Sequence, residues 1–206
     1  MTTAMLPARY RVIARCEENH DTVTLGMEPV DRPIAACLPG QFTMLYAFGV
    51  GEVPVSVSGI GEVRLAQTLR AVGAVTRALC AAVPGQMIGV RGPYGTDWGL
   101  SGAAAEGRDL VVGAGGIGLA PLRPVLLEAL AARERYVRVV LLVGARTPED
   151  LIFARELDVW RRRGVDVETT IDRPVQGWDG QVGFVSQLVH RASTLPARWR
   201  SSAGPR

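Results

Sequence analysis

The hydrophobic pattern of this chain changes near residue 103, and that change constrains the fold more than any other feature. Before it, short β-branched or alternating runs are separated by glycine and proline turns. After it, apolar strand patterns alternate with longer helical patterns. The first pattern is typical of a small antiparallel barrel or sandwich, and the second of a parallel α/β sheet. The sequence therefore predicts an all-β domain over residues 1–102 and an α/β domain over residues 103–206.

The same pattern locates the individual elements. In the first domain, strands are expected at residues 10–14, 22–27, 41–46, 53–58, 62–70 and 86–90, with one helix over 75–82. In the second domain, strands are expected at 109–112, 137–143 and 165–170, with helices over 119–135 and 148–163. The Ala- and Gly-rich segment 101–107 is the expected linker between the two domains.

The distribution of charge argues against a nucleic-acid partner. The net charge is +3 and the isoelectric point is near 9.0, although the chain contains no Lys and all 23 basic residues are Arg. Four of these arginines lie in the last 16 residues, which contain no Asp or Glu, and the rest of the chain holds 19 basic and 20 acidic residues. The basicity therefore belongs to the tail, and no basic face for nucleic acid is expected.

No segment predicts a membrane span, an export signal or a metal site. The longest uncharged run, residues 34–51, is interrupted by Pro39 and Gly40, and residues 1–15 lack the apolar core of a signal peptide. The three cysteines, Cys16, Cys37 and Cys80, do not have the spacing of a zinc or iron–sulfur site. We expect a soluble cytoplasmic protein in which these cysteines are buried free thiols.

A glycine-rich turn is the main functional motif of the second domain. Gly113, Gly115 and Gly118 form a G-x-G-x-x-G pattern at the junction of an expected strand and an expected helix, with Gly116 and Ile117 inside it. This context is typical of a site for a dinucleotide pyrophosphate, the alternative being a tight structural turn. An ordinary NAD-dependent dehydrogenase would place an acid after the second strand, where this chain has Arg146.

Several further motifs, in order over about residues 8 to 190, resemble the ferredoxin–NADP reductase superfamily. Within it, the chain is most similar to the electron-transfer subunit of dihydroorotate dehydrogenase, to sulfhydrogenase gamma subunits and to the flavin subunit of anaerobic sulfite reductase. The matching stretches are Pro39-Gly40-Gln41-Phe42, Pro54-Val55-Ser56-Val57-Ser58, Val72-Gly73-Ala74-Val75-Thr76, Arg91-Gly92-Pro93-Tyr94-Gly95, Gly115-Gly116-Ile117-Gly118-Leu119-Ala120-Pro121, Gly144-Ala145-Arg146-Thr147-Pro148, and Asp172 with Gly177-Trp178, Gly180 and Val182-Gly183.

The resemblance implies an FAD-binding β-barrel followed by an NAD(P)-binding domain. It implies hydride transfer from NAD(P)H to FAD and electron transfer onward to a partner subunit of the dehydrogenase, hydrogenase or sulfite-reductase type. The residues implied for FAD are Val53, Pro54, Val55, Ser56, Leu69, Arg70, Gly73, Val75 and Thr76, with Ser56 as the catalytic residue near the flavin N5. Those implied for NAD(P)H are Gly113, Gly115, Gly116, Ile117, Gly118, Pro121, Gly144, Ala145 and Arg146. The choice between NADH and NADPH stays open.

The chain also departs from the family pattern. Glu52 and Val53 stand where reductases of the superfamily often carry a phosphate-binding Arg, so Arg70 becomes the candidate for that contact. The Cys-Gly-Pro segment and the four clustered cysteines of a [2Fe–2S] centre have no counterpart. Two interpretations of the Arg-rich end follow: a flexible tail, or, as we prefer, a truncated or frame-shifted chain whose α/β domain is incomplete. The truncated or frame-shifted chain is expected to have impaired NAD(P)H turnover. The alternative function is a non-catalytic or impaired flavin-binding remnant that lacks a complete nicotinamide site.

Two other side chains have alternative interpretations. Trp98 follows the Gly-Pro-Tyr-Gly stretch, where it either shields the flavin or packs at the domain boundary. His20 has no nucleophile and carboxylate in a catalytic pattern with it, so a surface or capping role is expected. Hydride transfer itself requires no general acid or base from the chain.

Overall fold

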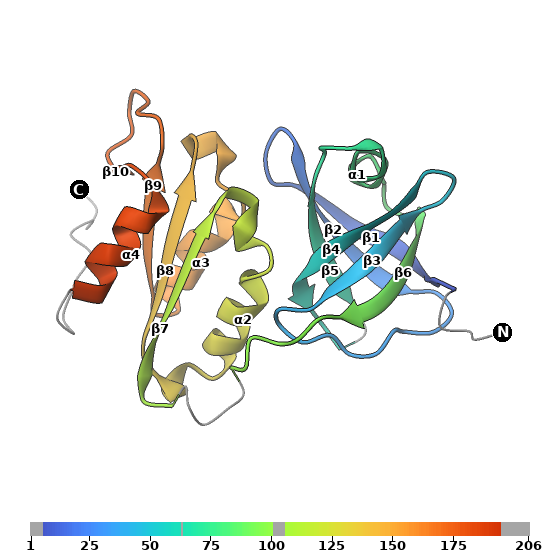
Figure 1. The fold of residues 1–206 in the computed structure, drawn as a ribbon, viewed down its shortest axis with the longest axis horizontal. Helices are drawn as coiled ribbons and strands as arrows, with labels where there is room; N and C mark the ends of the chain where they lie inside the picture. Colours follow the sequence, from blue (N-terminus) through green and yellow to red (C-terminus); the bar gives the residue numbers. More distant parts are fainter. Residues whose placement is uncertain (1–5, 63, 101–105, 195–206) are drawn as a thin grey trace.

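A computed structural model describes residues 6–62, 64–100 and 106–194. The chain forms a β-barrel and a parallel sheet flanked by helices, lying side by side (Figure 1). The expected antiparallel barrel followed by a parallel α/β domain is therefore confirmed. The expected boundary between residues 102 and 103 lies outside the described residues.

Six antiparallel strands close the barrel in the order β1-β2-β5-β4-β3-β6. Alternation along the strands fills its interior: Val23, Leu25 and Met27 of β2 all point inward and are buried. A short helix, α1, caps one end through the buried Leu79 and Cys80. The bounds are β1 Ala8–Glu17, β2 Thr22–Pro29, β3 Phe42–Ala47, β4 Gly51–Ile60, β5 Leu65–Arg70, α1 Ala74–Cys80 and β6 Met87–Tyr94.

The second sheet is parallel throughout, with strand order β10-β9-β8-β7. Helices α2 and α3 pack on one face around buried residues such as Leu141 and Trp160, and α4 covers Val140 and Leu142 on the other face. The central strand β8 is almost continuously apolar because helices cover both of its faces. The bounds are β7 Arg108–Gly115, α2 Arg123–Ala131, β8 Tyr136–Ala145, α3 Ala154–Arg162, β9 Val165–Ile171, β10 Gln181–Val182 and α4 Val185–Thr194.

The helices of the second domain start later than the sequence predicts. A 3-10 helix, Gly116–Leu119, precedes α2, which begins at Arg123 because Pro121 and Pro124 fit only the first turn of a helix. Similarly, the segment expected to be helical from Pro148 forms a 3-10 turn, and α3 begins at Ala154. The strand β10 and the helix α4 were not predicted.

No helix in the described ranges is long and apolar enough to cross a membrane. Within the same ranges, no group of three or more His, Cys, Asp or Glu side chains is placed to hold a metal ion.

The cysteine thiols give a first testable prediction. Cys37 is 4% exposed, and burial raises its pKa to about 11; burial also raises the pKa of Cys80, whose Sγ donates to Leu69 O. Because only the thiolate reacts, we expect both thiols to resist iodoacetamide at pH 8 in the native protein and to react after unfolding. Mass spectrometry of the labelled peptides measures this. Rapid native alkylation of Cys37 would show that the barrel core opens.

Candidate active site

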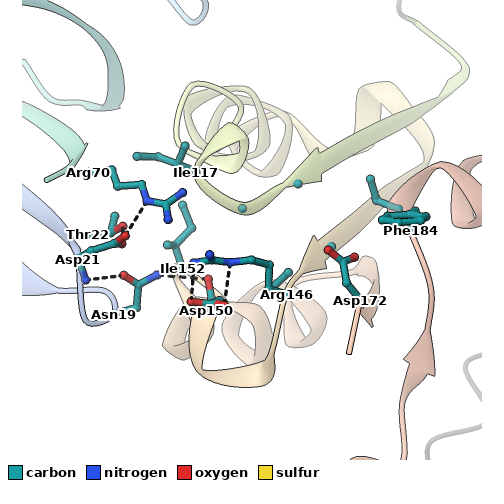
Figure 2. A pocket seen from close by; sticks show the side chains of 15 residues that line it. Asn19, Asp21, Thr22, Arg70, Ile117, Arg146, Asp150, Ile152, Asp172 and Phe184 are labelled. Atoms are coloured by element: carbon teal, nitrogen blue, oxygen red, sulfur yellow. Dashed lines mark hydrogen bonds and ion pairs between the residues drawn. The ribbon is translucent and has the colours of Figure 1, made fainter. Parts of the chain in front are cut away.

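A cavity of about 320 Å³ lies between the barrel and the carboxyl ends of β7, β8 and β9 (Figure 2). In open α/β sheets, ligands bind in the crevice outside these strand ends. The wall from the barrel comes from the β1–β2 turn and the end of β5, and the opposite wall from the loops after β7, β8 and β9 and from the start of α4. The lining residues are Asn19, Asp21, Thr22, Arg70, Gly115, Gly116, Ile117, Gly144, Ala145, Arg146, Asp150, Ile152, Asp172, Phe184 and Val185.

The glycine-rich turn forms an open cradle on one side of this cavity. Apart from the adjacent residues, no atom of the described chain lies within 4 Å of the position that a Cβ would occupy on Gly115 or Gly116, so a ligand can approach the backbone closely. Gly116 has a φ of +50°, in the left-handed region that glycine adopts without a steric penalty. The turn into the 3-10 helix starts here and exposes backbone amides that have no partner inside the helix.

The structure brings six of the nine predicted nucleotide residues to the cavity. These are Gly115, Gly116, Ile117, Gly144, Ala145 and Arg146. Gly113, Gly118 and Pro121 do not line it. A Cβ on Gly113 would instead lie 3.4 Å from Val189 Cγ2 of α4.

Gly144 also has a packing role that the sequence did not reveal. A Cβ at this position would lie 3.0 Å from Val185 Cβ, which is tighter than nearly all real contacts. The glycine therefore allows α4 to begin directly against the end of β8, and this places Val185 and Phe184 at the edge of the cavity.

Two arginines face the cavity from opposite domains. Arg70, at the end of β5, donates from Nε to Asp21 Oδ2 at 2.7 Å, and its two terminal nitrogens have no partner among the described residues. Arg146, after β8, lies with Nε 3.2 Å from Asp150 Oδ2. Burial raises the pKa of Asp21, but hydrogen bonds from Arg70 and Thr22 outweigh it, so the pKa lies below the usual value.

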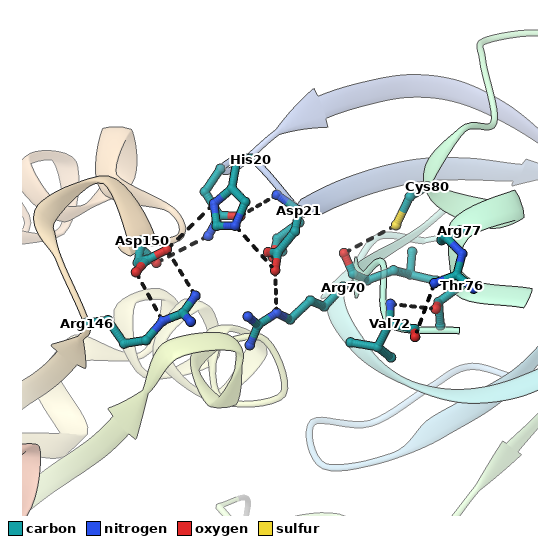
Figure 3. A network of polar contacts seen from close by, with 12 residues as sticks. His20, Asp21, Arg70, Val72, Thr76, Arg77, Cys80, Arg146 and Asp150 are labelled. Carbon is teal, nitrogen blue, oxygen red and sulfur yellow. Dashed lines mark hydrogen bonds and ion pairs between the residues drawn. The ribbon is translucent and has the colours of Figure 1, made fainter. Parts of the chain in front are cut away.

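His20 lies between the two ion pairs (Figure 3). Its Nε2 is 3.7 Å from Asp21 Oδ2, and its Nδ1 is 3.7 Å from Asp150 Oδ1. The imidazole is exposed, in agreement with the expected surface position. The polar side chains thus form a row in the order Arg70, Asp21, His20, Asp150 and Arg146, in which each arginine is held by a neighbouring carboxylate.

The carboxylates of this row were missed by the sequence analysis. Asp150 stands four residues after Arg146, a spacing that brings the two charges together. Asp172, which the sequence analysis names among the matching stretches, lines the cavity outside this row; it follows β9, and its amide donates to Ala145 O at 2.9 Å. Asp21 and Asn19 belong to the β1–β2 turn, and nothing in the local pattern of that turn indicates a site. Only the packing of the two domains brings it to the cavity.

The residues predicted to contact a flavin surround a gap in the barrel wall. Pairing between β4 and β5 covers only Val57–Ile60 of β4, so the first half of β4 has no partner strand on its β5 side. This unpaired half contains Val53, Pro54, Val55 and Ser56. A proline, which has no N–H, is tolerated here because no partner strand needs that donor. Ser56 is half-buried, and its hydroxyl has no hydrogen-bond partner within the described ranges. Leu69 and Arg70 end β5 on the other side of the gap.

The start of α1 lies beside the same gap. Thr76 Oγ1 accepts hydrogen bonds from Val72 N at 3.0 Å and Gly73 N at 2.9 Å, which fixes the loop that leads into the helix. No atom lies near the position of a Cβ on Gly73, and a Cβ on Gly51, the first residue of β4, would lie 3.2 Å from Val75 Cγ2. The first amides of α1 thus have open space in front of them and no partner inside the helix.

Trp98 packs against the turn before β3. A Cβ on Gly40 would lie 2.8 Å from Trp98 Cδ1, and the amide of Trp98 donates to Pro39 O at 3.1 Å. The contact lies within the barrel and leaves Trp98 56% exposed, so both interpretations of Trp98 stay predictions. It also explains why a glycine follows Pro39.

Comparison with known proteins shows which oxidoreductase subunits the chain is similar to. Residues 112–198 match the oxidoreductase NAD-binding domain family. The chain is 36% identical over 164 residues to the sulfhydrogenase 1 gamma subunit of Pyrococcus furiosus, covering 77% of this chain and 55% of that protein. It is 39% identical over 159 residues to a probable dihydroorotate dehydrogenase B (NAD(+)) electron transfer subunit of Methanothermobacter thermautotrophicus, covering 76% and 53%. Over about three quarters of its length, the chain is thus similar to electron-transfer and gamma subunits of this kind.

Solved structures share the fold of this chain at low sequence identity. The ferredoxin reductase in carbazole 1,9a-dioxygenase has a TM-score of 0.75 at 22% identity, covering 90% of this chain and 56% of that one. The flavohemoglobin of Malassezia yamatoensis, solved with bound FAD and heme, has a TM-score of 0.72 at 19% identity, covering 87% and 49%.

These relatives bear on two of the expectations. The gamma subunit and the electron transfer subunit are, by name, parts of multi-subunit enzymes, and both support an oxidoreductase of the NAD-binding type. The non-catalytic remnant is not favoured by these comparisons. The chain spans about half the length of the curated relatives that it matches.

Proposed function

We propose that this chain is an FAD-dependent NAD(P)H oxidoreductase of the electron-transfer subunit type. It takes a hydride from NAD(P)H and supplies electrons to a partner subunit that carries the substrate site. The observation that carries the proposal is the arrangement of the cavity: the glycine cradle of one domain faces Arg70 of the other, at the end of the barrel strand that borders the β4–β5 gap. We also propose the domain division 1–102 and 103–206, with the linker between them.

The barrel residues fit the flavin cofactor. The half of β4 that has no partner strand on its β5 side offers Ser56 along one edge of the gap, where Val55 O already accepts from Gln67 Nε2 at 2.8 Å. The first amides of α1 offer donors for a pyrophosphate. Arg70 adds a charge-assisted contact through its free terminal nitrogens. Thr76 acts indirectly, because its hydroxyl already holds the Val72–Gly73 backbone. When bound, FAD supplies the hydride acceptor and allows electrons to leave one at a time.

The second domain fits a dinucleotide. The Gly115–Ile117 cradle can receive the pyrophosphate of NAD(P)H, and Arg146 and Asp150 lie after β8 on the side where the adenosine ribose is expected. We propose a preference for NADH, because Asp150 partly neutralises Arg146 and would repel a 2′-phosphate. The role of the protein in this step is to hold the donor and the acceptor in contact and to exclude water.

The test is steady-state turnover with an artificial acceptor. Protein loaded with FAD is mixed with NADH and ferricyanide, and oxidation of NADH is followed by its absorbance. We expect turnover with NADH, slower turnover with NADPH, and none without FAD. Yellow, FAD-loaded protein that oxidises neither nucleotide would contradict the proposal and return the non-catalytic remnant as the better account.

A further inference from the structure

Among the described residues, three hydrogen bonds join the two domains. Asn19 Nδ2 donates to Asp150 O at 3.3 Å between two residues that line the cavity, and the other two are made by side chains that do not line it. Glu18, in the β1–β2 turn of the barrel, accepts a hydrogen bond through Oε2 from the backbone amide of Phe153, at 2.9 Å. Arg123, the first residue of α2, donates from Nη1 to the carbonyl oxygen of the fully buried Ser58 on β4, at 2.7 Å. Each contact therefore joins one side chain to the backbone of the opposite domain.

Both side chains are also held within their own domains. Thr24 Oγ1 donates to Glu18 Oε1 at 2.6 Å, so both carboxylate oxygens of Glu18 are occupied. Arg123 Nε lies 3.0 and 3.1 Å from the two carboxylate oxygens of Glu156, and its guanidinium lies 5.1 Å from the centre of the Phe153 ring. The side chain of Arg123 is only 18% exposed, so water weakens these contacts little.

A chain of hydroxyl groups inside the barrel connects the contacts of Glu18 and Arg123. Thr24 Oγ1 lies 2.9 Å from Thr68 Oγ1, which lies 2.8 Å from Ser58 Oγ. Phe153 completes the ring of contacts: its amide donates to Glu18, and its aromatic ring lies against the guanidinium of Arg123. We call this closed set of contacts, made by Glu18, Thr24, Thr68, Ser58, Arg123 and Phe153, the interdomain clasp.

The clasp acts on both walls of the cavity. Phe153 has a φ of 54°, a left-handed conformation that is unusual for a bulky residue and persists only where the surroundings impose it. The neighbouring Ile152 and Asp150 line the cavity. Arg123 begins α2 directly after the segment that contains the glycine cradle, so a shift of Arg123 also shifts the cradle.

We propose that Glu18 and Arg123 are positioning residues, which through the interdomain clasp set the distance between the barrel gap and the glycine cradle. This inference rests on the proposed function for its catalytic consequence. Neither side chain lines the cavity, so neither touches the dinucleotide there. Hydride transfer depends steeply on the approach of donor and acceptor, and a misplacement of about 1 Å costs up to about a hundredfold in rate. Loss of the clasp therefore lowers the rate of flavin reduction more than it lowers ligand affinity.

The experiment compares Glu18→Ala and Arg123→Ala with two matched controls. Glu17→Ala removes the adjacent carboxylate, whose one polar partner among the described residues is Arg15 of the barrel. Arg161→Ala removes an arginine that pairs with Asp158 within α3. Glu18→Gln is the conservative variant, because its amide oxygen can still accept from Phe153 N. For each variant we measure hydrogen exchange of the peptide containing Phe153, FAD affinity, NADH affinity and the single-turnover rate of flavin reduction. Thermal melting confirms that the variant is folded.

We expect faster exchange at Phe153 and a fall of about 10- to 100-fold in the reduction rate for both alanine variants. FAD and NADH dissociation constants should change by no more than about twofold, and Glu18→Gln and both controls should resemble the wild type. Wild-type reduction rates in both alanine variants, or unchanged exchange at Phe153 in Glu18→Ala, would overturn the proposal.

A different result would count against the proposed function alone. If the wild type binds FAD but neither NADH nor NADPH reduces that FAD, the proposed function fails, and exchange at Phe153 still decides whether the clasp joins the domains. If Glu18→Ala does not fold, Arg123→Lys gives the same comparison, because it keeps the positive charge but loses the bidentate geometry.

Discussion

Replacing Gly115 with valine is expected to weaken NADH binding by at least about a hundredfold, which corresponds to about 2.7 kcal/mol, while FAD content stays unchanged. The backbone of Gly115 is extended and no atom lies near its Cβ position, so the protein tolerates the side chain. The valine then fills the space through which a pyrophosphate would approach the backbone. Isothermal titration of the FAD-loaded variant with NADH measures the loss.

Gly118→Val is the matched comparison for this variant. Gly118 belongs to the same motif and has equally open space around its Cβ, but it does not line the cavity. The structure therefore predicts a much smaller loss of NADH affinity for Gly118→Val than for Gly115→Val. Equal losses would mean that the motif binds the nucleotide as the sequence pattern predicts and that the cavity is wrongly placed.

Replacing Thr76 with valine is expected to weaken FAD binding by about tenfold or more. The substitution keeps the shape of the side chain but leaves the amides of Val72 and Gly73 without their acceptor, at a cost of about 1 kcal/mol for each lost hydrogen bond. The loop in front of α1 then no longer presents its donors in a fixed arrangement. Fluorescence titration with FAD measures the affinity.

Thr76→Ser and Thr169→Val are the controls for this second prediction. The serine keeps the hydroxyl, so FAD affinity should stay close to that of the wild type. Thr169 lies on β9, away from the barrel, so its replacement tests the general effect of removing a threonine hydroxyl. FAD affinity that is unchanged in Thr76→Val would show that the flavin pyrophosphate does not lie at the start of α1.

The fold and half of the cavity could be predicted because they depend on local patterns. A strand that leads into Gly115, Gly116 and Ile117 specifies a tight turn with exposed amides, and this turn depends only on the local sequence. Gly118 and Pro121, which the sequence also predicts as nucleotide-binding residues, do not line the cavity, and the reason is local as well. Prolines at 121 and 124 delay α2, so the chain first forms a 3-10 turn, which carries these two residues away from the cavity.

The barrel side of the cavity was harder to predict because it depends on contacts between segments that are far apart in the sequence, within the barrel and across the domains. Asp21 reaches Arg70 over 49 residues of sequence, and Asn19 Nδ2 reaches Asp150 O over 131 residues. No periodicity in one segment carries this information. For α4 a usable signal did exist, since Val185, Leu188 and Val189 have the spacing of one helical face.

The central claim is that a nucleotide bound at the glycine cradle delivers its hydride to a flavin held at the β4–β5 gap. The most direct measurement mixes FAD-loaded protein with one equivalent of NADH in the absence of oxygen, and follows the visible absorbance of the oxidised flavin. The account predicts rapid loss of that absorbance, slowed when the transferred hydrogen at C4 of NADH is replaced by deuterium. FAD-loaded protein that binds NADH at the cavity and yet keeps its full flavin absorbance would contradict it.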